Sequence, residues 1–220
     1  GTHIGLYNCI SPDGGVAFVD EARQHSSLTK LSLFKRLPFD DRNFVWCLDY
    51  LNLEYLRLAG LTLAGEQTCR AVAATEIKYL RFDNCEFEDE EAVQVLVDNV
   101  RAERGPKGIS LKGEPFDSPE KLGEFVNALR GNTYLERLDI GDLHVRVGSF
   151  QALVIALREN RGLTHLGLTD CTMDDCYWDK LMDAIAEHPL LRTLVFQNIR
   201  HENESSVFEL RDAMHSLAGM

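Results

Sequence analysis

The strongest constraint on the fold is a short apolar motif, Leu-x-x-Leu-x-Leu, that returns along the whole chain. Its copies start at nearly even intervals, of which the interval from Leu53 to Ile77 is the shortest. A repeat period of roughly 20 to 50 residues is the mark of a chain built from similar units stacked on one another. The copies begin at Leu28, Leu53, Ile77, Pro106, Leu135, Leu163 and Leu191, after a partial copy that contains Ile4 and Leu6.

Each unit changes its hydrophobic period half-way. In the Leu-x-Leu core, apolar and polar residues alternate, which is the period of a short strand with one buried face. The second half has helical spacing instead, with apolar residues at i, i+3, i+4 and i+7. The clearest example is the set Leu122, Phe125, Val126 and Leu129. Each unit therefore predicts one strand followed by one helix.

Stacked units of this kind predict a curved architecture. Consecutive strands joined through a helix run parallel, and a single unit cannot bury its own apolar edge. Because a helix is wider than the spacing between strands, the stack bends toward its strands. We expect one α/β domain over residues 1–220, an open solenoid of about eight repeats with a concave parallel sheet and convex helices.

Two features link these units to a known family. The units from Ile77 onward are long enough to carry a full helix, and Cys9, Cys85 and Cys171 each stand three positions after the last apolar strand residue. In both respects, and over segment 156–171, the sequence resembles leucine-rich repeats of the ribonuclease-inhibitor class, shared with NOD-like receptors and Ran GTPase activators. The resemblance covers nearly the whole chain and implies the fold, but it does not single out one function.

The two ends predict that the sequence is part of a longer protein. The chain starts inside a unit, and it has no polar capping unit of the kind that solenoids use at their ends. Near the other end, Phe208, Leu210, Met214 and Leu217 predict a final helix.

The amino-acid composition limits the classes of partner and the cellular location that we expect. With 45% hydrophobic and 26% charged residues, the chain is typical of a soluble globular protein. A net charge of −12 argues against nucleic acid or an anionic membrane as partner. No apolar run is long enough to cross a membrane. Six cysteines without a compact framework favour reduced thiols and a cytoplasmic location.

The concave face predicts where a protein partner binds. Strand residues that flank the buried leucines point into the concavity, and aromatic and basic side chains gather there in the first four rows. Further along, Asp139, Asp142 and Asp170 predict a more acidic portion. The alternative is that these are ordinary water-facing strand residues. The candidate binding residues are Tyr7, Lys30, Phe34, Lys35, Tyr55, Arg57, Tyr79, Arg81, Arg137 and Asp139.

Nothing in the sequence indicates an enzyme, a cofactor or a metal site. Glycine-rich phosphate loops, nucleophile elbows and HExxH motifs are absent. His165 and Cys171 are close in sequence, but Cys171 falls at a position that the family buries, and Cys171 with Cys176 lacks further zinc ligands. We expect a protein-binding module, part of a sensor, adaptor or effector. GTPase activation of the Ran-activator type and enzyme inhibition of the ribonuclease-inhibitor type remain alternatives, and the oligomeric state is open.

Overall fold

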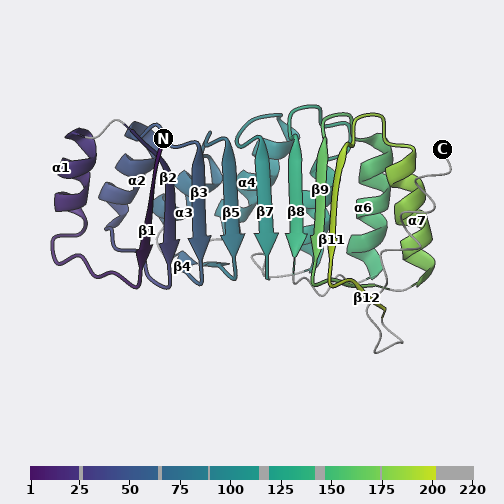
Figure 1. Ribbon diagram of the computed structural model, residues 1–220, viewed down its shortest axis with the longest axis horizontal. Coiled ribbons are helices and arrows are strands. Elements are labelled where there is room, and N and C mark those ends of the chain that lie inside the picture. Colours follow the sequence, from purple (N-terminus) through teal and green to yellow (C-terminus); the bar gives the residue numbers. More distant parts are fainter. Residues whose placement is uncertain are drawn as a thin grey trace.

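The computed structural model describes residues 1–24, 27–63, 66–88, 90–113, 119–141, 147–173 and 175–201. Within these residues the chain forms an eight-stranded sheet and seven helices, so the predicted α/β class is confirmed (Figure 1). Neighbouring strands run parallel, and their order in space follows their order in the sequence. The strands are β1 (Thr2–Tyr7), β2 (Leu28–Phe34), β3 (Tyr55–Ala59), β5 (Tyr79–Asp83), β7 (Gly108–Lys112), β8 (Arg137–Gly141), β9 (His165–Thr169) and β11 (Thr193–Gln197).

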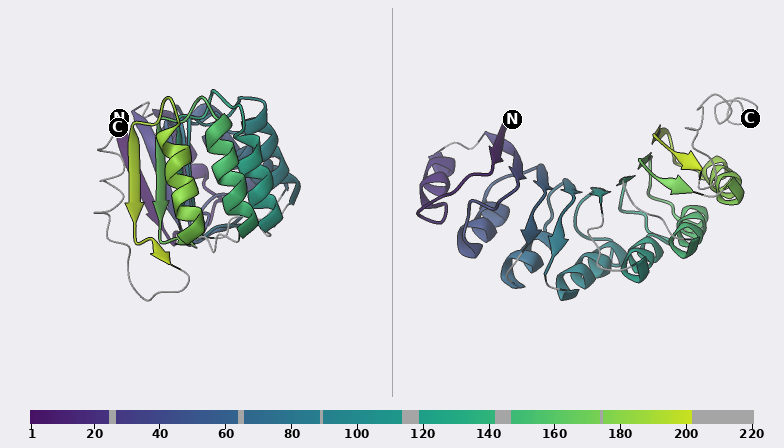
Figure 2. Two further views of the ribbon diagram at one scale, coloured as in Figure 1. Left: turned by 90° about the vertical axis from the view of Figure 1, so that its right-hand side faces the viewer. Right: turned by 90° about the horizontal axis from the view of Figure 1, so that it is seen from below.

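The helices cover one side of this sheet. The sheet bends away from them into an arc, with the strands on the inner side and the helices on the outer side (Figure 2). The bend follows because a helix with its side chains is about 10 Å wide, whereas strands lie about 4.8 Å apart. The helices are α1 (Val16–Gln24), α2 (Asp41–Tyr50), α3 (Glu66–Ala73), α4 (Glu90–Arg101), α5 (Pro119–Ala128), α6 (Val147–Glu159) and α7 (Asp175–Ala186).

Short strands pair beyond the carboxyl ends of the main strands. β4 (Thr62–Leu63) pairs with β6 (Glu86–Phe87), and β10 (Thr172–Met173) pairs with β12 (Arg200–His201). Both pairs are parallel, as in the main sheet. They fix the path of the chain as it leaves one strand and turns toward the next helix.

The register of the sheet places the motif residues side by side. Leu31, Leu56 and Leu80 are direct partners on consecutive strands, and the row continues through Ile109 to Leu138. All five side chains are fully buried. Because successive strand side chains point to opposite faces, this alignment puts every second residue into the core and the residues between them on the inner side of the arc.

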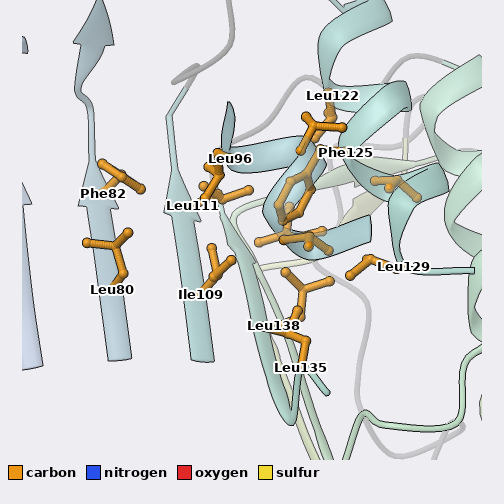
Figure 3. Packing of buried hydrophobic residues seen from close by; sticks show 14 of the residues in the cluster. Leu80, Phe82, Leu96, Ile109, Leu111, Leu122, Phe125, Leu129, Leu135 and Leu138 are labelled. Atoms are coloured by element: carbon orange, nitrogen blue, oxygen red, sulfur yellow. The ribbon is translucent and has the colours of Figure 1, made fainter. Parts of the chain in front are cut away.

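The core lies between the sheet and the helices. Phe125 of α5 and Leu111 of β7 point into the same space, together with Leu96 of α4 (Figure 3). The predicted helical face of α5 is confirmed, since Leu122 and Phe125 are both buried. Full burial of a side chain such as Phe125 contributes about 1.5–3 kcal/mol.

A polar side chain holds the loop before each of the last three strands. Asn132 accepts from the backbone N–H groups of Tyr134 and Leu135, and its amide donates to the carbonyl of Val100 in the preceding unit. Asn160 repeats this pattern at the equivalent place in the next unit. In the unit after that, His188 accepts through Nδ1 instead. These buried side chains satisfy backbone donors that no strand partner reaches. Their role was not predicted from the sequence.

Two of the three cysteines that follow strands are buried, as predicted. Cys85 and Cys171 are free thiols that donate to backbone carbonyls, Cys171 to Thr169 at 3.3 Å. Burial raises the pKa of the Cys85 thiol, which keeps it protonated and unreactive. Cys9 is free and half-buried. The side chains of Cys69 and Cys176 lie outside the described residues, as do Asp142 and the predicted helix around residues 208–217.

Across the described parts of the chain, no helix combines the length and the apolar character needed to cross a membrane.

Candidate protein-binding surface

Three rows of side chains cross the inner side of the sheet, with one residue from each strand in every row. We call these residues, with the residue that follows each strand, the inner face. The rows are His3, Lys30, Tyr55, Tyr79, Gly108, Arg137, His165 and Thr193; Gly5, Ser32, Arg57, Arg81, Ser110, Asp139, Gly167 and Val195; and Tyr7, Phe34, Ala59, Asp83, Lys112, Gly141, Thr169 and Gln197.

Nine of the ten candidate residues lie in these rows, and the tenth borders them. Lys35 directly follows β2, where its positive φ of 68° turns the chain out of the strand. Exposure differs widely among the candidates. Tyr7 is 67% exposed, whereas Tyr79 is half-buried and Asp139 has a side chain that is only 20% exposed. Some of the candidate side chains are therefore exposed to solvent, whereas others are packed against neighbouring side chains.

Tyr79 and Asp139 form the centre of a bonded cluster. The Tyr79 hydroxyl on β5 donates to Asp139 Oδ2 on β8 at 2.7 Å, across the intervening strand β7. Arg137 donates to the same oxygen at 2.7 Å, and His165 Nε2 lies 2.9 Å from the other carboxylate oxygen. The Arg137 guanidinium also lies 5.2 Å from the centre of the Tyr79 ring. One carboxylate thus ties together side chains from three strands.

Two glycines make this cluster sterically possible. A Cβ at Gly108 would overlap the Tyr79 ring, which leans over β7 at that position. A Cβ at Gly167 would overlap the Asp139 carboxylate in the same way. Both glycines occupy inner-face positions of the aligned motif. A position without a side chain was therefore the feature of the sequence that could have predicted this contact. Arg137 and Asp139 were predicted to lie on the concave face, but the contact between them was not predicted.

The cluster shifts the acidity of its members. Burial and the hydrogen bond to the Asp139 carboxylate raise the pKa of Tyr79 to about 12. Burial by itself would raise the pKa of Asp139, but the hydrogen bonds from Arg137, Tyr79 and His165 outweigh it and hold that pKa below its usual value. Near neutral pH the carboxylate is therefore charged and the phenol is neutral.

A second buried carboxylate organises the arginines nearer the amino terminus. Asp83 has a side chain that is 8% exposed, and it accepts from Arg57 at 2.6 Å and from Arg81 at 2.9 Å. Burial by itself would lower the pKa of Arg81, but the bond and charge of Asp83 raise it overall. That one carboxylate serves both arginines was not predicted from the sequence.

Aromatic rings flank these arginines. The Arg57 guanidinium lies 5.0 Å from the centre of the Phe34 ring, and Phe34 packs against Tyr7 with 6.0 Å between ring centres. On the other side, Tyr55 and Tyr79 stack with 5.4 Å between their centres. The first four strands thus present a nearly continuous band of rings and guanidinium groups.

The two halves of the inner face differ in charge. The first half, on β1, β2, β3 and β5, carries four cations (Lys30, Lys35, Arg57, Arg81) and one carboxylate (Asp83), which gives +3. The second half, on β7, β8, β9 and β11, carries two cations (Lys112, Arg137) and two carboxylates (Asp139, Asp170) among its described residues, which gives zero. We expected an acidic second half from Asp139, Asp142 and Asp170, of which Asp142 lies outside the described residues. The two described carboxylates are paired, Asp139 with Arg137 and Asp170 with Lys112 at 3.3 Å.

Of the residues considered for catalysis or zinc, Cys171 and His165 have described side chains, whereas that of Cys176 lies outside the described residues. Cys171 is fully buried, and its thiol donates to backbone carbonyls. His165 faces the inner side and bonds to Asp139. Over the described ranges, no three His, Cys, Asp or Glu side chains are grouped so that they could hold a metal ion. Comparison with known proteins adds no assignment, since no protein-family model and no curated protein matches the chain.

Proposed function

We propose that this chain is a leucine-rich repeat solenoid of the ribonuclease-inhibitor class and that it binds another protein through its inner face. The recurring motif, the alternation of strand and helix and the curved sheet support the repeat assignment. Stacked repeats provide an extended concave surface that is not needed for the core. We further propose that the chain is the recognition part of a sensor, an adaptor or an effector.

One observation carries the binding proposal. The first half of the inner face has an excess of three positive charges and four aromatic rings, on a protein whose net charge is −12. Arginine and aromatic side chains are the residues on which binding energy concentrates. Two of the cations, Lys30 and Lys35, are exposed and form no ion pair with another described residue. Such lysines are available to a partner.

The charge excess indicates what kind of partner segment fits. Carboxylates complement the excess cations, and apolar side chains would cover the rings of Tyr7 and Phe34. The partner segment is therefore acidic with interspersed apolar residues. Among the described residues, the charges of the second half of the inner face are paired with one another, so this half offers less unpaired charge to such a segment.

Selection of short peptides from a random displayed library, on the immobilised chain, tests this proposal. We expect the selected peptides to be acidic and to contain apolar residues. Lys30→Glu with Lys35→Glu reverses two inner-face charges and abolishes their binding. Arg101→Glu with Lys180→Glu makes the same change in net charge on the outer helices and leaves binding intact. Selected peptides that bind both double variants equally well would overturn the proposal.

A further inference from the structure

The outer side of the arc contains a groove between α1 and α2. These are the two helices nearest the amino terminus (Figure 1). Its volume is about 570 Å³, within the range of pockets that bind ligands. One wall comes from α1, with Val16 and Arg23, and the other comes from α2, with Trp46 and Tyr50. The groove therefore lies on the opposite side of the sheet from the inner face.

The groove forms because the two helices are joined at one end and separated at the other. At their amino ends, Phe39 packs against both Phe18 and Phe44, with ring centres 5.1 Å and 6.1 Å apart. The Gly14 carbonyl also accepts from the backbone N–H of Asp40 and from the side chain of Asn43, each at 3.0 Å. Toward the carboxyl ends, the Arg23 guanidinium crosses the space and lies 4.7 Å from the centre of the Trp46 ring.

Two aromatic rings, the half-buried Trp46 and the exposed Tyr50, line the groove toward the carboxyl end of α2. Tyr50 is 71% exposed and stacks on Trp46, one helical turn earlier, with 5.4 Å between ring centres. Val16, which lines the groove at the amino end of α1, is 45% exposed. Large apolar side chains gathered at an open groove mark binding surfaces more often than scattered ones do. Tyr50 and Val16 do not belong to the core among the described residues, whereas Trp46 packs against it.

The charges around the groove favour a cation. Asp20, Asp40 and Asp49 line it against Arg23 and Arg42, so its net charge is −1, opposite in sign to the first half of the inner face. The groove already holds one guanidinium in this way, since Arg23 lies over Trp46 and 3.4 Å from the Asp20 carboxylate. Asp49, which precedes Tyr50 in the sequence and also lines the groove, forms no ion pair with any other described residue.

We propose that the groove between α1 and α2 binds a basic peptide segment with apolar residues, whose arginine or lysine side chain lies on the Tyr50 ring beside Asp49. The cation–π contact and the ion pair would repeat, for the ligand, what Trp46 and Asp20 do for Arg23. Apolar side chains of the segment would contact Val16 and the Trp46 ring. The site is independent of the inner face, and it would allow the chain to hold two partners of opposite charge.

Calorimetric titration with a short amidated peptide that alternates arginine and leucine tests the proposal. We expect saturable binding, and none for the same peptide with glutamate in place of arginine. Tyr50→Ala with Asp49→Asn should weaken binding roughly five- to tenfold. The matched control, Ile155→Ala with Asp183→Asn, removes an exposed apolar side chain and an aspartate from α6 and α7, and it should leave binding unchanged.

Further variants separate this site from general attraction to an acidic protein. Asp49→Lys keeps both rings in place and should also weaken binding, which covers the case in which loss of Tyr50 disturbs α2. Lys30→Glu with Lys35→Glu should not weaken it, because those residues lie on the inner face. Absence of saturable binding, or equal weakening by the Asp49 variants and the α6–α7 control, would overturn the proposal.

Discussion

The two halves of the inner face are built on the same rows but use their charges differently. In the first half, one buried carboxylate, Asp83, serves two arginines, and the lysines beside them are exposed. In the second half, Asp139 receives bonds from Tyr79, Arg137 and His165, and Asp170 pairs with Lys112. Repeating backbone geometry thus gives one surface with unpaired charge and one whose described charged groups are paired with one another. We interpret the first as suited to recognition and the second as contributing to stability.

The largest expected effect comes from filling the gap beneath Tyr79. Gly108→Val places a side chain where the Tyr79 ring lies, and we expect a loss of about 2–3 kcal/mol in the free energy of unfolding, measured with urea. Gly5→Val is the matched control in the first half, because a Cβ there meets only Phe34 at an ordinary 3.9 Å. Equal losses for the two variants would remove the distinction between the halves.

A smaller effect separates the two stacked tyrosines. Tyr79→Phe deletes the hydrogen bond to the Asp139 carboxylate, which we expect to cost about 1.5 kcal/mol of unfolding free energy. Tyr55→Phe deletes a hydroxyl for which the described residues provide no hydrogen bond, and it should change stability by less than about 0.5 kcal/mol. Urea denaturation of both variants measures the difference. If Tyr55→Phe proved the more costly change, the cluster around Asp139 would not be the stabilising one.

The affinity for an acidic peptide should depend more on the first half of the inner face than on the second, which is the reverse of the order expected for stability. Arg57→Gln removes a cation from the first half and should weaken an acidic peptide about fivefold, whereas Arg137→Gln should change its affinity less than about twofold. Fluorescence anisotropy at two salt concentrations measures both, and the Arg57 effect should shrink at high salt. A greater loss for Arg137→Gln would move the binding surface to the second half.

The smallest effect concerns pH at the end of the second half. Burial, with a contribution from Arg161, lowers the pKa of His188 from 6.5, and its Nδ1 accepts two backbone N–H bonds that protonation would break. The unfolded chain therefore binds a proton more readily, and stability falls as pH drops below 6.5. His188→Asn, which supplies the residue found at positions 132 and 160, should reduce this loss in urea titrations. An unchanged pH dependence would exclude His188 as its source.

The order of the strands and the buried positions within each unit could be predicted from the amino-acid sequence. The spacing of the motif predicted eight parallel strands in order, each second residue buried, and the helical face around Phe125. It could do so because strand and helix periods are local properties, and because every unit repeats the same apolar positions. It also named most residues of the inner face, since alternation along a strand decides which side chains leave the core.

How those side chains pair depends on contacts between residues that are distant in the sequence. Tyr79 reaches Asp139, two strands further along the sheet, because Gly108 leaves room on the strand between them. Asp83 joins two arginines from neighbouring strands, and Arg23 of α1 lies over the Trp46 ring of α2. Such contacts depend on the free space and charge that neighbouring units present, which no period within one unit specifies. The repeat therefore determined where each side chain starts, and its neighbours in space determined what it binds.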